Sequence, residues 1–322
     1  MVTVALTIAG AALVLLAAAA SWTVARAALA ACHEPSRALA AAVATAYFAV
    51  VPAEVARVVD DLRVGLAVAT LIAALVALAL RRHNAKAPPP PTDTTTSTST
   101  PTPSIDAPAP SSSGTRLVTP ATIVTAAAMA CLFALVAACA FRGNFYDEPI
   151  HWPTILQIAR GVVPPRIVVE PDTIHHYHWG FDAVAAALVD AGLDVENAED
   201  VAQCASFALL LAVAWVLGAR LGGGRVAAGI VAVGVPLASS PLLWPLVDLG
   251  PLSLPSPYPA RWSEPLQIAQ PPAMFFFQHP QGFAMPLFLA VLLVFLDDKR
   301  RPARRVVGAV FLGVVALAHV VY

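Results

Sequence analysis

Residues 119–141 read TPATIVTAAAMACLFALVAACAF, a run without a single charged side chain. A helix needs about 20 apolar residues to cross the hydrocarbon core of a bilayer, and this run has that length. Because lipid offers the backbone no hydrogen-bond partners, such a segment must be a helix or a strand of a closed barrel. The run lacks the alternation of polar and apolar residues typical of a barrel strand. It therefore predicts a transmembrane helix.

Similar apolar segments recur along the chain, which is 58% hydrophobic and 12% charged, a composition that argues against a soluble protein. Six further segments have the length of a span: 3–22, 64–80, 201–219, 226–244, 282–296 and 306–322. Segment 38–51 is apolar but short, so it can span, re-enter or lie in the interface. We expect an all-α, polytopic bundle of seven or eight transmembrane helices. The net charge of −1 argues against nucleic acid as a partner.

Basic side chains predict the orientation of these spans. One short loop carries Lys299, Arg300, Arg301, Arg304 and Arg305, and the loop after residue 80 carries Arg81, Arg82 and Lys86. Cytoplasmic loops are enriched in Lys and Arg, so both loops are expected inside the cell. Counting crossings from them puts the loops 142–200 and 245–281 on the non-cytoplasmic side. The chain is thus predicted to be a multi-pass cell-membrane protein with two outer loops.

The composition also predicts the domain organisation. Residues 87–116 are almost entirely Pro, Thr, Ser and Ala, a composition that buries too little apolar surface to order the chain. We expect a disordered cytoplasmic linker there, between an N-terminal transmembrane module, 1–86, and a second module, 117–322, that carries the outer loops. The last residue, Tyr322, lies in an apolar run, so we expect the second module to be truncated at its C-terminus.

The first outer loop begins with two carboxylates and a histidine, in Arg142-Gly-Asn-Phe-Tyr-Asp147-Glu148-Pro149-Ile-His151-Trp152. Proline favours the first helical position and aspartate caps well, so a helix is expected from Pro149, with Pro153 as the alternative start. From a start at Pro149, Asp147 and His151 stand one turn apart and can act together as a base or as metal ligands. The alternative is that Asp147 is only a cap and Glu148 a solvated neighbour.

Two amphipathic helices of this loop are expected to lie in the membrane interface. The first presents Trp152, Ile155, Leu156 and Ala159 on one face. The second presents Phe181, Val184, Leu188 and Val189, and leaves Asp182 and Asp190 off that face. Between the two, Pro164 and Pro165 end the first helix and an extended stretch follows.

Histidines precede the second helix and end the second outer loop. His175, His176 and His178 match no standard zinc-binding spacing. They are expected either to contact a substrate or a metal, or to meet lipid headgroups and backbone carbonyls. In the second outer loop, Arg261 and His279 are candidates for binding a phosphate. The alternative for that proline-rich loop is a plain surface role.

A transmembrane helix that runs into an outer Asp-Glu pair, followed by two interfacial helices and a return to the membrane, resembles the polytopic glycosyltransferases of the GT-C class. The resemblance covers residues 119–322, and the stretches 146–152 and 177–182 look like loops of uncharacterised actinobacterial-type members. It implies a donor sugar on polyprenyl phosphate and an envelope glycan, lipid or protein as acceptor. The helices and linker before residue 119 depart from the pattern of the class.

The resemblance also implies roles for the loop residues. Asp147, with Glu148 beside it, would be the catalytic base that takes the proton of the acceptor hydroxyl while polyprenyl phosphate leaves. The substrate and its leaving phosphate would be bound by His151, His175, His176, His178, Arg261 and His279. A divalent metal, Mg²⁺ or Mn²⁺, on Asp147 and His151 is left open. The alternatives are a non-catalytic scaffold for envelope assembly and, because intramembrane charges are few, less readily a transporter of lipid-linked substrates.

Overall fold

The computed structural model describes residues 2–31, 36–86, 120–141, 148–175, 179–222, 224–237, 279–296, 308–309 and 312–313. Of the described residues, 86% are helical, which confirms the mainly helical fold. The helices are α1 (Val2–Ala31), α2 (Arg37–Val59), α3 (Leu62–Lys86), α4 (Pro120–Ala140), α5 (Glu148–Ala159), α6 (Gly180–Asp190), α7 (Val195–Gly222), α8 (Arg225–Leu237) and α10 (His279–Leu296). A two-stranded antiparallel sheet, β1 (Arg166–Ile167) and β2 (Glu170–Ile174), lies between α5 and α6.

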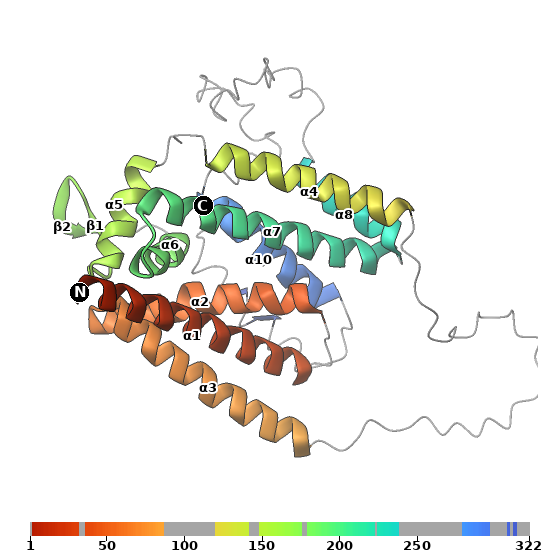
Figure 1. Ribbon diagram of the computed structural model, residues 1–322. Helices are drawn as coiled ribbons and strands as arrows, with labels where there is room; N and C mark the ends of the chain where they lie inside the picture. The colour runs from red at the N-terminus through yellow and green to blue at the C-terminus, as the bar shows by residue number, and fades with distance from the viewer. Residues whose placement is uncertain are drawn as a thin grey trace, which may run out of the picture.

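The long helices lie roughly side by side, and the loop between α4 and α7 covers one end of them. Figure 1 shows α1, α2, α4 and α7 as neighbouring rods, with α5, α6 and the small sheet gathered at the end where α1 begins. The sheet occupies the stretch expected to be extended, and the all-α prediction missed it. The β-branched residues Ile167 of β1 and Thr173 and Ile174 of β2 favour strand geometry there.

Four helices among the described residues are long and apolar enough to cross a membrane, and they indicate a membrane protein. They are residues 7–30 of α1, all of α2, residues 62–82 of α3, and α7. Segment 38–51, which the sequence left undecided, gains its length because α2 continues through Pro52 to Val59. Shorter apolar helices cover 122–138, 225–236 and 282–295. The predicted span 306–322 lies outside the described residues except at four positions.

Glycines let the helix backbones approach each other closely. A Cβ atom on Gly10 of α1 would overlap the carbonyl oxygen of Asp190 at the end of α6, and one on Gly65 of α3 would overlap the carbonyl oxygen of Pro52 in α2. A single cluster of buried apolar residues draws on α1, α2 and α3 as well as on α5, α6, α7 and α10. The first three helices therefore share a core with the loop helices.

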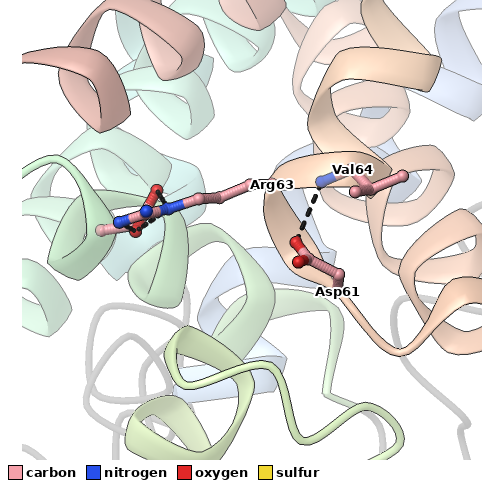
Figure 2. Close-up of polar contacts among 4 residues, drawn as sticks. Asp61, Arg63 and Val64 are labelled. Atoms are coloured by element: carbon pink, nitrogen blue, oxygen red, sulfur yellow. Dashed lines mark hydrogen bonds and ion pairs between the residues drawn. The ribbon is translucent and has the colours of Figure 1, made fainter. Parts of the chain in front are cut away.

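An ion pair joins the beginning of α3 to the end of α6. Arg63 donates from Nε and Nη2 to Oδ1 of Asp190, at 2.8 and 2.6 Å. Figure 2 shows the Arg63 side chain extending away from α3, whereas Asp61 turns back and accepts the backbone N–H of Val64 at 3.0 Å. The planar guanidinium fixes direction as well as distance, and the Asp190 side chain is only 5% exposed. The pair thus sets the position of α6 against α3.

The start of α7 is capped by an exposed carboxylate. Asp194 accepts the backbone N–H of Asn197 at 2.9 Å and its side-chain amide at 2.6 Å. These hydrogen bonds, the backbone one first, favour the ionised form and lower the pKa of Asp194. The cap therefore stabilises α7 more strongly when Asp194 carries its charge.

Substituting Gly10 by alanine should loosen the contact between α1 and α6. The added methyl group must push the helices apart, at a cost of about 1–3 kcal/mol. This exceeds the gain of about 0.5–1 kcal/mol from replacing glycine in a helix. Gly10→Ala should lower the Tm measured by circular dichroism in detergent. Gly234→Ala, where a Cβ meets nothing within 4 Å, should leave the Tm unchanged or raise it. Equal shifts in the two variants would contradict the close contact.

The Asp194 cap should give stability a weak dependence on pH. A carboxyl group whose pKa is lower in the folded state stabilises that state above its unfolded pKa, about 3.9. That stability is lost as the pH falls through the folded pKa. Asp194→Asn keeps an acceptor oxygen but not the charge, so the Tm of the wild type should exceed that of the variant at pH 6. The difference should shrink towards pH 3. A difference that is constant across this range would rule out the ionised cap.

Candidate functional site

α5 begins directly after Asp147, where the sequence predicts the site. Its first residue is Glu148, so the predicted start at Pro149 is confirmed to within one residue and the alternative start at Pro153 is wrong. Pro153 lies inside the helix, at the cost of one backbone hydrogen bond. His151 therefore stands in the first turn of a helix that follows the apolar helix α4.

The buried face of α5 differs from the predicted one. Its buried side chains are His151, Thr154, Ile155 and Ile158. Of the predicted face only Ile155 is fully buried, whereas Trp152, Leu156 and Ala159 are partly buried. The predicted face included neither His151 nor Thr154, but both are buried because other parts of the fold supply polar partners for them.

A buried pair of side chains joins the first turns of α5 and α6. Nδ1 of His151 lies 2.7 Å from Oδ1 of Asp182, and the two side chains are 1% and 0% exposed. The ring of Phe181 meets the His151 ring edge to face at 6.3 Å, and Phe283 of α10 packs on Phe181 at 6.0 Å. The histidine and carboxylate thus share a largely apolar surrounding, where a direct hydrogen bond is strong.

Asp182 corrects the prediction for the second loop helix. The sequence analysis placed it off the apolar face of α6, yet it is buried beside Phe181 and four alanines of that helix. Val184, Leu188 and Val189 of the predicted face are only partly buried. The oxygen Oδ2 of Asp182 has no hydrogen-bond partner within the described part of the chain. Because the neighbouring side chains of α6 are short alanines, the Asp182 carboxylate can contact His151 of α5 within the core.

A second polar contact ties α5 to α7. The indole Nε1–H of Trp152 donates to Oε2 of Glu199 at 2.5 Å. Glu199 is 2% exposed, and Gln203 and Ser206 follow it on the same face of α7, also buried. Trp152 was expected to anchor in the membrane interface, but its polar edge faces this row. A row of polar residues at helical spacing in an apolar helix was visible in the sequence and could have identified Glu199.

His175 lies at the end of the small sheet, next to α5. Its Nδ1 is 3.5 Å from Oγ1 of Thr154, and its backbone N–H donates to the carbonyl of Pro165 at 2.8 Å. The Gln157 amide fixes the sheet to α5, because it accepts the N–H of Arg166 at 2.7 Å and donates to its carbonyl at 3.0 Å. Residues three positions apart share a helix face, so Thr154, which contacts His175, lies on the same face of α5 as His151.

The other predicted site residues are described only in part. Asp147, His176, His178 and Arg261 lie outside the described residues. Glu148 and His279 begin α5 and α10, and the structure describes their backbone alone. The structure gives side-chain contacts for two predicted residues, His151 with Asp182 and His175 with Thr154. It adds Thr154, Asp182 and Glu199, for which the sequence analysis proposed no functional role.

The predicted metal site stays a prediction. Within the described ranges, no group of three or more His, Cys, Asp or Glu side chains could hold a metal ion. Nδ1 of His151 already faces Asp182, an arrangement common in proteins for a histidine that uses Nε2 for proton transfer or ligation. A carboxylate behind an imidazole also fixes the tautomer of the ring. The chemistry this pair supports best is proton transfer.

Removing the Glu199 carboxylate should destabilise the contact between α5 and α7. Glu199→Ala leaves the indole N–H of Trp152 without its buried acceptor, which costs about 1–3 kcal/mol. Glu199→Gln keeps an acceptor oxygen at the same place and should retain most of that stability. Urea unfolding followed by tryptophan fluorescence measures both variants. If glutamine destabilises as much as alanine does, the charge of Glu199 matters more than the hydrogen bond to Trp152.

The geometry of α5, α6 and α7 carries the functional argument for this chain. No protein-family model, curated protein or solved structure matches it.

Proposed function

We propose that this chain is a membrane glycosyltransferase of the GT-C type. It moves a sugar from a polyprenyl-phosphate donor to an envelope glycan, lipid or protein on the non-cytoplasmic side. One observation supports this most: residues 148–190 fold as helix, hairpin and helix over one end of the bundle, directly after the apolar helix α4 (Figure 1). This architecture is the one from which the resemblance to the class was drawn.

The positions of the basic side chains support the proposed sidedness. Arg81 and Arg82 lie at the end of α3, and Arg225 begins α8. Figure 1 draws both of these points at the end of the bundle opposite α5 and α6. If the basic end is cytoplasmic, α5 and α6 face the outside. In this arrangement α2 is the eighth span of the proposed topology, and the loops 142–200 and 245–281 are external.

The proposed reaction needs a base, a site for the leaving phosphate and a groove for the prenyl chain. Asp147 takes the proton of the acceptor hydroxyl, with Glu148 beside it, and the N-terminus of α5 favours its ionised form. The leaving phosphate is stabilised by basic side chains, for which Arg261, His279 and the histidines 175, 176 and 178 are the candidates. Exposed apolar helix faces, such as that of α3 with Leu71 and Leu75, can contact the prenyl chain and lipid alike.

Transport of a lipid-linked substrate is the second candidate function. It is favoured by the burial of Glu199, Asp200 and Gln203 in α7, one of the helices able to cross a membrane. Ionisable residues within spanning helices often mark a transport path. These three residues lie within the first turns of α7, however, next to the loop helices. A position at the start of α7 is consistent with a site on the outer side of the membrane as well as with a path through the bilayer.

The test of the glycosyltransferase proposal is sugar transfer in nanodiscs, which leave both faces accessible. Radiolabelled polyprenyl-phosphate sugars are supplied with envelope lipids and glycans, and transferred label is measured. Asp147→Asn removes the base without changing its size and should lower the rate about 10²- to 10⁴-fold. Asp172→Asn, an exposed carboxylate of β2 in the same loop, should leave the rate unchanged.

The other outcomes distinguish the alternatives. Transfer that Asp147→Asn does not reduce would exclude Asp147 as the base. Movement of labelled donor across a sealed liposome membrane, without transfer to any acceptor, would favour the transporter. Neither transfer nor movement, together with stable binding of envelope proteins, would favour the scaffold.

A further inference from the structure

We infer that the N-terminal module, residues 1–86, stays bound to the second module, residues 117–322, when the chain between them is cut, as one subunit stays bound to another. The inference goes beyond the proposed function and does not depend on the reaction. In the described part of the chain, the two modules meet only through noncovalent contacts between helices. The partner that this surface of the second module fits is therefore a bundle of three apolar helices.

Each module has a buried apolar core of its own. In the N-terminal module, Val24 of α1 packs in one cluster with Ala73 of α3. Tyr47 of α2 lies against this cluster, and its hydroxyl donates to the carbonyl of Ala69 in α3 at 2.8 Å. In the second module, another cluster draws its buried residues from α4 and α7. Both modules therefore have internal packing that does not involve the other.

Helix α2 faces the second module along most of its length. Its residues in the core that the two modules share run from Leu39, in its first turn, to Ala56, near its end. It packs against α6, α7 and α10 as well as against α1 and α3. Of its most apolar stretch 50% is buried, against 33% in α1 and in α3. Figure 1 draws α3 at the edge of the bundle, beside α1 and α2. The N-terminal module thus binds the second module mainly through α2.

Contacts at the end of α6 fix one position of the N-terminal module. Arg63 of α3 donates to the carboxylate of Asp190, whose side chain is only 5% exposed. A Cβ atom on Gly10 of α1 would overlap the carbonyl oxygen of the same aspartate. A Cβ atom on Gly192, just after α6, would overlap Cγ2 of Thr7 in α1. Such close backbone approach and a charge-assisted hydrogen bond of fixed direction both select a single arrangement.

The covalent connection adds no contact to this interface. A tether raises the local concentration of one module near the other. Helices in a bilayer satisfy their own backbone hydrogen bonds, and they associate through packing and through polar contacts between them. The N-terminal module makes both kinds of contact with the second module. The affinity between the modules therefore lies in the contacts that the structure describes.

Cutting the full chain after it has folded tests the inference. A protease recognition sequence is inserted after Thr100, and the intact protein is purified in detergent and bound to a resin through a tag after Tyr322. The chain is then cut and washed, and the N-terminal fragment that leaves the resin is measured over time on gels. We expect the fragment to remain on the resin in an amount equimolar with the second module.

The ion pair provides an interface variant with a matched control. Arg63→Ala leaves the buried carboxylate of Asp190 without its guanidinium, so the fragment should leave the resin about 5- to 30-fold faster. Arg57→Ala is the control, because Arg57 is similarly exposed but pairs with Glu54 inside α2. It should not change the rate of release.

Close backbone approach provides a second matched pair of variants. Gly10→Val places a side chain against the carbonyl of Asp190 and should also speed release. Gly234→Val, where a Cβ atom meets nothing within 4 Å, should leave the rate unchanged. Circular dichroism before the cut shows whether each intact variant is folded. Should Arg63→Ala fail to fold, Arg63→Lys keeps the charge but not the two donor nitrogens, and it should release the fragment faster than Arg57→Lys does.

The outcomes support or overturn the inference without reference to sugar transfer. A wild type that loses the fragment in the first wash overturns it. Equal retention in the wild type, Arg63→Ala and Gly10→Val also overturns it, because two fragments held in one detergent micelle would then explain the result. Retention in the wild type and the controls, with faster release from the interface variants, supports it. A failure of the proposed function leaves all of these outcomes unchanged.

Discussion

Close contact between small side chains is the constraint on which this structure depends. In lipid, helices gain little from the hydrophobic effect when they associate, so they rely on van der Waals packing and on polar contacts between them. Alanine supplies much of the shared core, from Ala40 in α2 to Ala186 in α6 and Ala290 in α10. Where a backbone carbonyl contacts a neighbouring helix, as at Gly10, the absence of a Cβ atom in glycine leaves room for it. The few polar contacts then fix positions that apolar packing alone leaves loosely defined.

Much of the helical fold could be predicted from hydropathy, because a long apolar run by itself indicates a helix buried in lipid or protein. Helices α1, α3, α7 and α10 contain predicted segments, and α4 covers all but the first and last residues of segment 119–141. Helix α2 was left undecided because the apolar segment before Pro52 is short, although the helix continues through this proline to Val59. The small sheet was missed because two short strands stabilise each other, and the Gln157 contact that fixes them depends on tertiary structure.

The candidate site could be predicted only where residue type alone was informative. His151 and His175 were singled out because histidine beside a carboxylate or in a cluster is uncommon. Asp182 was assigned to the solvent side, because helical periodicity cannot show that a polar residue has a partner 31 positions earlier. Burial of Asp182 and Glu199 follows from the way three helices meet. The pattern of apolar residues in one helix predicts its buried face correctly only when the surface that it packs against is apolar.

The ion pair between Arg63 and Asp190 has a consequence for biogenesis. Its two residues are 127 positions apart, and the earlier one belongs to α3, which is synthesised before α6. Helices α1 and α3 are therefore already synthesised when α6 emerges. Gly10 and Arg63, which both contact Asp190 of α6, belong to these two helices. This contact therefore becomes complete only after the later helix, α6, has been made. If α6 were synthesised before α3, the carboxylate of Asp190 would lack this guanidinium until α3 followed.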